Sequence, residues 1–395
     1  MRANRDQSGH ERLDGRAHVI RTLRRLGPLS QADLARHAIL APSTVSGIVA
    51  GLRAEGLIAE VDRASGPVAG GSRGGRPGTL LVLQRSIGVA IGIDFGKQHV
   101  RVAVADLAHN ILTEKMHPLV ADRPAAEHIS CAASLFDDAL RELGMETSQV
   151  VGVAMGIPGP VRRTSGLLGD TTILPGWVGV DPLSAVSRAL NVPVQVDNDA
   201  NLGALSEWMW GAARGSTDVA YLKVSTGIGG GLIIGGQPFA GAGGTAGEIG
   251  HVVIDPQGPV CRCGNRGCLE TLAGGAALLR ALQPARGSGL TISDIVGLAQ
   301  GGDAECGRVL AESGHALGIA LAALCNLINP ELVVVGGELA TAGELLLDPL
   351  RQSLRHAALR SAVYDVEVVQ GRLGERAEML GAVALALRSS ALTTA

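Results

Sequence analysis

Three cysteines and one histidine crowd into a short stretch of this chain and restrict its fold more than any other feature. His251 is followed by Cys261-Arg-Cys263-Gly-Asn-Arg-Gly-Cys268, which places three sulfurs and an imidazole within 18 residues. Cys₃His sets hold Zn²⁺ in a closed tetrahedron, and the interspersed glycines allow tight turns around an ion. The sequence therefore predicts one structural zinc per chain, with His251, Cys261, Cys263 and Cys268 as its ligands.

Two alternatives to zinc stay open for this stretch. The spacing can arise by chance, with reduced thiols in an ordinary loop, and a disulfide is the weaker alternative because three cysteines cannot pair completely. The N-terminus lacks the apolar segment of roughly 7–15 residues that a secretory signal needs. No apolar run reaches the roughly 18 residues that span a bilayer. We therefore expect a cytoplasmic protein, without a membrane partner, whose crowded thiols bind metal.

Charge is divided unevenly between the two ends of the chain. Residues 1–85 contain 13 Arg, no Lys and 7 acidic residues, which gives a net charge of +6. The whole chain carries −3, so residues 86–395 carry −9. A basic end on an acidic body is expected when that end meets phosphate, although a basic solvated arm is an equal alternative.

The basic end has the pattern of a helix-turn-helix. Helical spacing of apolar residues predicts a first helix over 14–26, which Gly27-Pro28 ends. Ser30-Gln-Ala-Asp33 resembles a capping box, which begins a second helix that runs through Arg36. Pro42 suits the first turn of a third helix over 43–54. In such a unit, the last helix lies in the major groove of DNA.

The third predicted helix has a hydroxyl-rich face near its start. Its apolar stripe, which we expect to pack inward, consists of Val45, Ile48, Val49 and Leu52. That arrangement leaves Ser43, Thr44 and Ser46 outward, where short hydroxyls at a helix N-terminus reach phosphates or base edges. Gly47 is also outward and carries no side chain that could contact a base. The alternative is an ordinary three-helix packing unit.

Two short β-type runs, 57–61 and 79–83, flank a long basic loop and complete the pattern of a winged helix-turn-helix. A Gly-Arg-Pro stretch can place arginine in a narrow minor groove, where the negative potential is greatest. Arg73 and Arg76 are the candidates for this contact. A disordered linker is the alternative interpretation of the loop.

The rest of the chain uses one hairpin pattern twice. Runs rich in β-formers at 89–94 and 100–106 flank a first turn, and a second copy spans 219–234 around the Gly-rich stretch 225–231. Helical patterns follow each copy, at about 125–143 and 273–282. The repeat predicts a duplicated α/β unit with a cleft between two lobes. Residues 226–231 could wrap a phosphate with backbone N–H groups, although Gly-rich hairpins are common without one.

Carboxylates and an amide flank the predicted zinc site and one strand end. Asn198 and Asp199 follow an apolar run and precede a helix from about residue 200. A carboxylate at such a strand end can accept a hydroxyl proton. Glu248 lies one helical turn before His251, and Glu270 follows the last cysteine closely, so the metal would fix both nearby. Together these groups suit vicinal hydroxyls, while a surface or capping role is the alternative for each carboxylate.

These motifs resemble the ROK family (repressors, open reading frames, kinases), in particular its xylose-repressor and N-acetylglucosamine-repressor branch. The resemblance covers nearly the whole chain, from about residue 14 to the last helix. The matching motifs are Gly156-Ile-Pro-Gly-Pro-Val161, Leu174-Pro-Gly-Trp177, Asn198-Asp199, Glu248-Ile-Gly-His251 and Cys261-x-Cys-Gly-x-x-Gly-Cys-x-Glu270. The last two together are highly specific to the family.

The resemblance implies an α/β fold in which a winged helix-turn-helix precedes a two-lobed, actin/hexokinase-like (ribonuclease H-like) domain. It also implies operator binding as a homodimer or homotetramer. Asp199 would stand at the catalytic-base position of family kinases, and Gly159 would pass close to the sugar. The residues that would contact the sugar are Asn198, Asp199, Glu248, His251 and Glu270.

One departure from the family separates this chain from its kinases. Family kinases carry Asp-x-Gly-Gly-Thr in the first hairpin turn, where ATP phosphates bind, whereas this chain has Asp94-Phe-Gly-Lys-Gln98. Side chains in that turn should crowd the close backbone approach that phosphate needs. Asp199 and the second Gly-rich stretch remain, so an ATP-dependent sugar kinase with an appended DNA-binding domain stays as the alternative function.

The sequence thus predicts a sugar-responsive, DNA-binding transcriptional regulator, a repressor of carbohydrate-use genes and not an enzyme. Its expected partners are double-stranded operator DNA and a small sugar effector, and it would associate with the nucleoid when DNA-bound. The predicted domains are a DNA-binding domain, 1–85, and a sensor domain, 86–395. Within the sensor, lobe 1 covers about 86–200 plus a C-terminal helix at 376–392, and lobe 2 covers about 201–375 with the zinc site.

Overall fold

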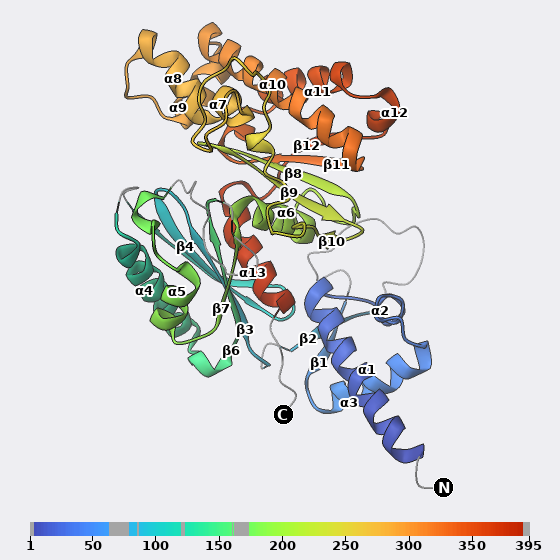
Figure 1. Ribbon diagram of the computed structural model, residues 1–395. Coiled ribbons are helices and arrows are strands. Elements are labelled where there is room, and N and C mark those ends of the chain that lie inside the picture. The colour runs from blue at the N-terminus through green and yellow to red at the C-terminus, as the bar shows by residue number, and fades with distance from the viewer. Residues whose placement is uncertain are drawn as a thin grey trace.

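The computed structural model describes residues 4–62, 79–84, 87–119, 123–159, 161 and 174–389, without the side chains of 4–14, 175 and 389. Three bodies are visible in Figure 1: an N-terminal head and two sheet-containing lobes. The head consists of α1 (Asn4–Leu26), α2 (Gln31–Ala38), α3 (Pro42–Ala54), β1 (Ile58–Asp62) and β2 (Thr79–Leu83).

Local signals in the sequence explain the head. The Ser30 hydroxyl accepts a hydrogen bond from the Asp33 backbone N–H at 3.1 Å, which caps α2 as predicted. Ile39, in the left-handed region at φ 53°, ends α2 two residues later than the expected Arg36. The first helix begins at Asn4, earlier than the predicted residue 14. Antiparallel β1 and β2 form the stem of the wing.

The first lobe contains a five-stranded sheet in the order β5-β4-β3-β6-β7. Its strands are β3 (Val89–Phe95), β4 (His99–Asp106), β5 (Ile111–Pro118), β6 (Val150–Ile157) and β7 (Val194–Asn198). Helices α4 (Ala125–Leu143) and α5 (Pro182–Leu190) pack on it, around an apolar cluster that includes Phe136 and Trp177.

The second lobe contains another five-stranded sheet, in the order β10-β9-β8-β11-β12. Its strands are β8 (Val219–Val224), β9 (Ile228–Ile234), β10 (Gln237–Pro238), β11 (Leu332–Gly336) and β12 (Glu367–Gln370). Its helices are α7 (Leu269–Ala273), α8 (Gly275–Arg286), α9 (Ile292–Gln300), α10 (Ala304–Ile328), α11 (Glu344–Ala357) and α12 (Arg360–Val363).

The two sheets have the same topology. In each, the first strand pairs antiparallel with the second, the second pairs antiparallel with the third, and the two remaining strands add in parallel. This arrangement confirms the predicted duplication of one α/β unit. Between the sheets lie α6 (Asp199–Trp210), which contacts β8 and β9, and α13 (Ala377–Ser389), which contacts β3 and β6.

One described helix, α10, is long and apolar enough to cross a membrane by length and composition alone. Its buried side chains, including Leu310, Leu317 and Leu321, belong to the apolar core of the second lobe. Helix α11 packs along it. Core helices of this kind often pass a membrane-span test, so α10 is weak evidence for a membrane segment.

Candidate functional site

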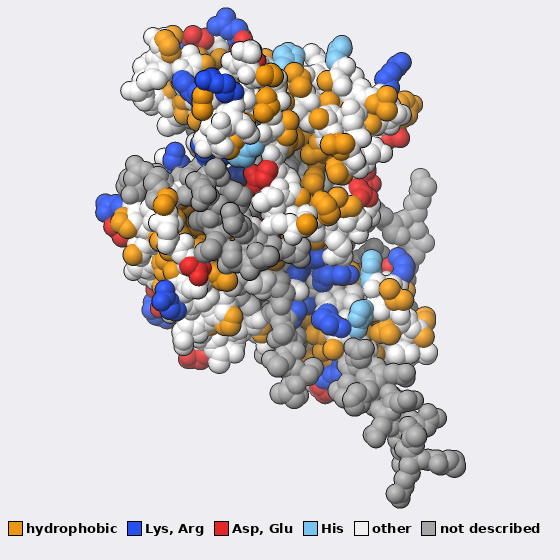
Figure 2. Space-filling model, viewed as in Figure 1, with side chains coloured by type: hydrophobic (Ala, Val, Ile, Leu, Met, Phe, Trp, Pro, Cys, Tyr) orange, Lys and Arg blue, Asp and Glu red, His pale blue; other side chains and the backbone are white. Residues whose placement is uncertain are grey.

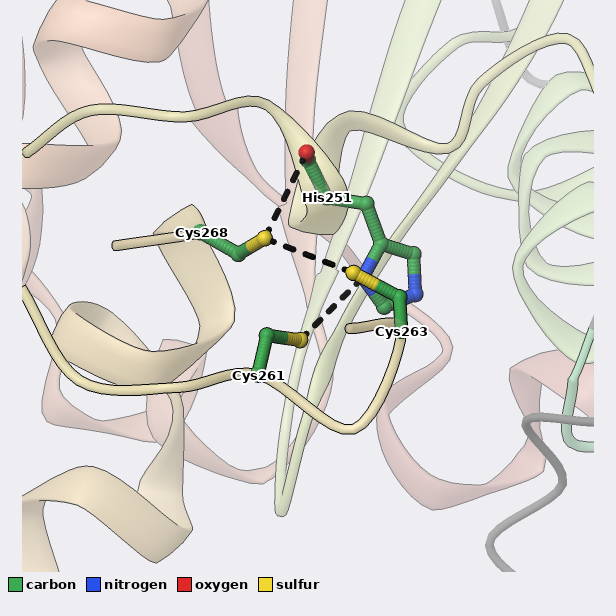
Figure 3. Close-up of side chains that lie close together, drawn as sticks. All are labelled: His251, Cys261, Cys263 and Cys268. Carbon is green, nitrogen blue, oxygen red and sulfur yellow. Dashed lines mark hydrogen bonds between the residues drawn. The ribbon is translucent and has the colours of Figure 1, made fainter. Parts of the chain in front are cut away.

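The four predicted zinc ligands come together in the second lobe. Figure 3 shows His251, Cys261, Cys263 and Cys268 pointing toward one another. One ligand atom from each lies within 4.8 Å of the others. His251 ends the short 3-10 helix η4 (Ile249–His251), and Cys268 directly precedes α7. Between them the chain folds back on itself, with Val253 bridged to Cys268 and Val260 bridged to Arg266.

The distances between the donor atoms suit a tetrahedral ion. Cys263 Sγ lies 3.6 Å from Cys268 Sγ, and Cys261 Sγ lies 3.5 Å from His251 Nδ1. Zn–S bonds of about 2.3 Å in a tetrahedron separate two sulfurs by roughly 3.8 Å. A disulfide requires about 2.05 Å, so these thiols are not bonded to each other. Burial and the hydrogen bond to Glu270 raise the pKa of Cys261 to about 12, so a thiolate there needs a cation nearby.

His251 can serve both the metal site and its surroundings because its two ring nitrogens face different groups. Nδ1 faces the cysteines and lies 3.6 Å from Glu270 Oε1, while Nε2 lies 4.0 Å from Glu248 Oε2. Burial, together with the negative charge of Asp199, raises the pKa of Glu248. Glu270 is held by Arg262, whose Nη2 donates to Oε2 at 2.9 Å. Sequence reasoning missed Arg262, although it lies inside the cysteine motif.

The predicted residues at the end of β7 also come together. Asn198 Nδ2 donates to the Gly159 carbonyl at 2.7 Å, and Asn198 Oδ1 accepts from the Ala200 N–H, which caps α6. Asp199, the next residue, starts α6. Both the start of α6 and Glu270 lie against the β8–β9 hairpin: a Cβ at Gly229 would lie 2.8 Å from Ala200 Cβ, and one at Gly227 would lie 3.0 Å from Glu270 Oε2. Figure 2 shows acidic and histidine side chains gathered where the two lobes meet.

Two further residues join Asp199, and sequence reasoning missed both. Lys223 Nζ lies 2.8 Å from Asp199 Oδ2 and 2.9 Å from Glu378 Oε1. Lys223 lies in β8, and Glu378 lies in the first turn of α13. A lone lysine in the otherwise apolar run Val-Ala-Tyr-Leu-Lys-Val was the available signal for this cluster.

The first hairpin turn is obstructed in the way that the sequence predicts. His99 Nε2 lies 2.8 Å from Asp94 Oδ2, which is nearly buried. The His99 ring covers Gly96 so closely that a Cβ there would lie 2.3 Å from it. The ring therefore lies directly beside the backbone of the turn, in line with the expectation that side chains crowd it.

The second Gly-rich stretch requires a correction. Glycines 229–231 belong to strand β9 and do not form a loop, so only Ser225, Thr226 and Gly227 make the turn. A Cβ at Gly229 would lie 2.8 Å from Ala200 Cβ, and one at Gly231 would lie 2.6 Å from the Ala200 carbonyl. Glycine is present because α6 packs directly on this strand. The expectation that 226–231 wraps a phosphate was therefore wrong for residues 229–231.

The head presents the predicted DNA-facing surface in part. Ser43, Thr44 and Ser46 are exposed on α3, while Val45, Val49 and Leu52 are buried beneath them. The helix begins at Pro42 with no side-chain cap, so its first N–H groups remain available to a phosphate. Arg73 and Arg76 lie outside the described residues.

Known proteins resemble both parts of this chain. Residues 90–389 match the ROK family, and residues 14–62 match the MarR family. The xylose repressor of Bacillus subtilis is 30% identical over 363 residues, which cover 92% of each protein. The crystal structure of a ROK family transcriptional regulator, a homologue of the E. coli MLC protein, has a TM-score of 0.74 at 25% identity and covers 95% of each chain.

A family kinase matches a smaller share of the chain. A ROK family glucokinase from Streptomyces griseus, solved with glucose and AMPPNP, is 31% identical, with a TM-score of 0.64. The match covers 99% of that glucokinase but 76% of this chain, whereas both regulators match along nearly all of it. Since the ROK match spans well over half of its length, this chain belongs to the ROK family, with a MarR-type winged helix-turn-helix as its head.

Proposed function

We propose that this protein is a sugar-responsive transcriptional regulator that represses genes of carbohydrate use. One observation carries the proposal: a MarR-type head and a ROK domain occur in one chain, and the xylose repressor matches across both. The head would bind operator DNA with Ser43, Thr44 and Ser46 of α3, and with Arg73 and Arg76 of the wing. Such a protein acts in the cytoplasm, and on the nucleoid while it is bound to DNA.

The sugar site that we propose lies where the end of β7 faces the zinc region. Its residues would be Gly159, Asn198, Asp199, Glu248, His251 and Glu270. Carboxyl groups and an amide in this arrangement suit a ligand with several neighbouring hydroxyls. We propose one structural Zn²⁺ on His251, Cys261, Cys263 and Cys268, which would hold η4 and α7 together and so keep Glu248 and Glu270 in place.

We also propose the division of the chain that the sequence predicts, with a DNA-binding domain over 1–85 and a sensor over 86–395. The protein would act as a homodimer or homotetramer. Exposed apolar side chains on the second lobe, at Ile319, Leu327, Leu359 and Tyr364, support self-association. Light scattering of the purified chain measures the oligomeric state, and a strictly monomeric protein would contradict this part.

The test of the regulator is operator binding with and without sugars. DNA upstream of sugar-use genes beside this gene is titrated with the protein, alone and with each candidate hexose, N-acetylhexosamine or pentose. The effector should change operator affinity by about 5–150-fold, which corresponds to a coupling of about 1–3 kcal/mol. Binding that depends steeply on salt and ignores DNA sequence would contradict the proposal.

A matched pair of variants tests the DNA-facing surface. Thr44→Ala with Ser46→Ala should weaken operator binding by roughly 30-fold, since two polar contacts to DNA of the order of 1 kcal/mol each are lost. Ser293→Ala, which removes an exposed hydroxyl from α9 of the second lobe, should leave binding unchanged. Equal affinities for the two proteins would exclude these hydroxyls from the interface.

The kinase alternative has a direct test. ATP consumption is measured over the same sugar panel for the wild type and for Asp199→Asn. We expect little or no turnover, because His99 covers the first turn and Lys223 neutralises Asp199. Robust turnover that Asp199→Asn abolishes would establish a kinase instead.

A further inference from the structure

Lys223 connects three elements of the ROK domain through two ion pairs. Its ammonium lies 2.8 Å from Asp199 Oδ2 at the start of α6 and 2.9 Å from Glu378 Oε1 in the first turn of α13. The side chains are largely buried, with 21% of Lys223, 15% of Asp199 and 8% of Glu378 exposed. Among the described residues, Glu378 forms its ion pair with Lys223, so its link to the cluster runs through this lysine.

The charges of the cluster keep the lysine protonated. Burial alone would lower the pKa of Lys223, but Asp199, Glu378 and Asp94 together raise it well above its usual value. Burial raises the pKa of Glu378, an effect that Lys223 opposes. A buried ion pair is weak evidence for added stability, because desolvation offsets the attraction between the charges. Another role for the lysine is therefore worth testing.

Helix α13 runs from this cluster to the DNA-binding head. It packs on α6, β3 and β6, and it contacts α1 of the head. Val383 and Leu387 of α13 share one apolar cluster with Val19 and Leu23 of α1. The 13 residues of α13 span about 20 Å, so one helix covers the distance between the lysine cluster and the head.

We propose that Lys223 is a positioning residue that holds the Asp199 carboxylate in place as a hydrogen-bond acceptor for the effector, and that Glu378 passes a change at Asp199 to the head through α13. This inference rests on the proposed sugar site. With Lys223 bound at 2.8 Å, the Asp199 carboxylate is held in place and its oxygens can accept hydrogen bonds from effector hydroxyls.

The physical basis is competition for the Asp199 carboxylate. A sugar hydroxyl that donates to Asp199 shares the charge that Lys223 otherwise holds, so the ammonium is drawn toward Glu378. The two states then differ in their contacts at the first turn of α13. Because a packed helix moves as a rigid body, a shift at that turn also appears where α13 meets α1.

Glu378→Gln tests the transmission. The amide oxygen can still accept from Lys223, while the negative charge is lost. We expect sugar affinity and sugar-free operator affinity to stay within about threefold of the wild type, and the effect of sugar on operator affinity to fall at least fivefold. Glu375→Gln is the matched control, since Glu375 is an exposed carboxylate three residues earlier that pairs with Arg101 instead. An undiminished sugar effect in Glu378→Gln, or the loss of sugar binding itself, overturns the proposal.

Lys223→Gln and Lys223→Arg test the positioning role. The Gln variant should bind sugar roughly tenfold more weakly, and the Arg variant, which keeps the charge, should restore affinity to within about threefold. Unchanged sugar affinity in the Gln variant overturns the role of Lys223. If the Gln variant does not fold, Glu378→Gln still decides the transmission, and a Lys223→Arg variant that folds but has lost sugar affinity overturns the role of the positive charge.

Hydrogen exchange separates this inference from the proposed function. Without sugar or DNA, Glu378→Gln in the full chain should speed exchange of the amides of α13 and of 16–26 in α1, but not of α4. Faster exchange in α1 of the Glu378→Gln variant would support the connection from Glu378 through α13 to the head. If the wild type at the same time shows no response to sugar, the proposed function is contradicted while this connection stands. Unchanged exchange in α1 would overturn the connection from Glu378 to the head, whether or not sugar changes operator binding.

Discussion

The two sheets of the ROK domain have the same strand order, but their turns have diverged. In the first lobe, the β3–β4 turn is covered by the His99 ring, and the β4–β5 turn carries His109, which contacts the head. In the second lobe, the β8–β9 turn is only Ser225, Thr226 and Gly227, and the proposed zinc site is built beyond its sheet. The same sheet topology is therefore compatible with different functions, which depend on the turns and insertions between the strands.

Cys263→Ser should have the largest effect, because it removes a ligand from the cluster of one histidine and three cysteines, which among the described residues occurs in the second lobe alone. With one ligand lost, zinc content should fall from about one per chain toward zero. Glu248 and Glu270 should then lose their fixed positions, and sugar affinity should fall by roughly 10–100-fold or more. Metal analysis and calorimetric titration with the effector measure the two quantities.

Cys131→Ser is the matched control for this variant, since Cys131 is a single thiol on α4 of the first lobe. It should keep full zinc and full sugar affinity. One equivalent of zinc and normal sugar binding in Cys263→Ser would remove the metal site from the second lobe.

His109 provides the corresponding test in the first lobe. Its Nε2–H donates to the Arg24 carbonyl of α1 at 2.6 Å, and its ring packs edge-on against Trp210, with centroids 5.9 Å apart. Burial lowers the pKa of His109 to about 4. An unfolded histidine has a pKa of about 6.5, so unfolding takes up a proton between these values and stability falls as the pH falls. Above pH 6.5 this contribution is fully present, and about 3 kcal/mol is lost by pH 4.

His109→Asn removes the titrating ring and keeps a residue that tolerates the φ of 70° found here. Denaturation at pH 7, 6, 5 and 4 should show a shallower pH dependence for this variant than for the wild type. His117→Asn, an exposed histidine on β5, should follow the wild type. Parallel pH curves for wild type and His109→Asn would show that the head is not held by a neutral imidazole.

Gly229→Ala should have a moderate effect that is confined to the second lobe. The added Cβ would lie 2.8 Å from Ala200 Cβ, so α6 must shift away from β9. Overpacking of this kind costs about 1–3 kcal/mol of unfolding free energy. Gly243→Ala meets no atom within 4 Å and serves as the control in the same denaturation experiment. If both variants are equally stable, α6 does not pack as closely as described.

His99→Ala should have the smallest effect. Without the ring over Gly96, the backbone of the first turn becomes accessible, and we expect weak, millimolar-range binding of Mg-ATP, worth about 4 kcal/mol. Sugar affinity should not change, since the described contact of His99 is to Asp94 and not to a proposed sugar residue. Gln98→Ala, in the same turn, should bind no better than the wild type. Tight nucleotide binding by the wild type would show that the turn is not obstructed.

Local patterns predicted much of this fold correctly. The Ser30 cap, the apolar stripe of α3 and the two hairpins depend on neighbours in sequence, so spacing was enough to find them. The sequence did not predict the start of the first helix or the role of the glycines of β9 correctly. The length of α1 extends beyond its apolar period, and the glycines reflect the close packing of α6, which lies outside their own strand.

The sequence by itself determined the main parts of the protein: a basic head, a duplicated α/β body and a cluster of one histidine and three cysteines. These features can be recognised from the spacing of nearby residues and from the distribution of charged residues along the chain. Only the tertiary structure brought Lys223 to Asp199 and Glu378, and Arg262 to Glu270. Lys223 and Glu378 are separated by more than 150 residues, and they meet because α6 packs on both β8, which carries Lys223, and α13, which carries Glu378. No local pattern encodes that contact.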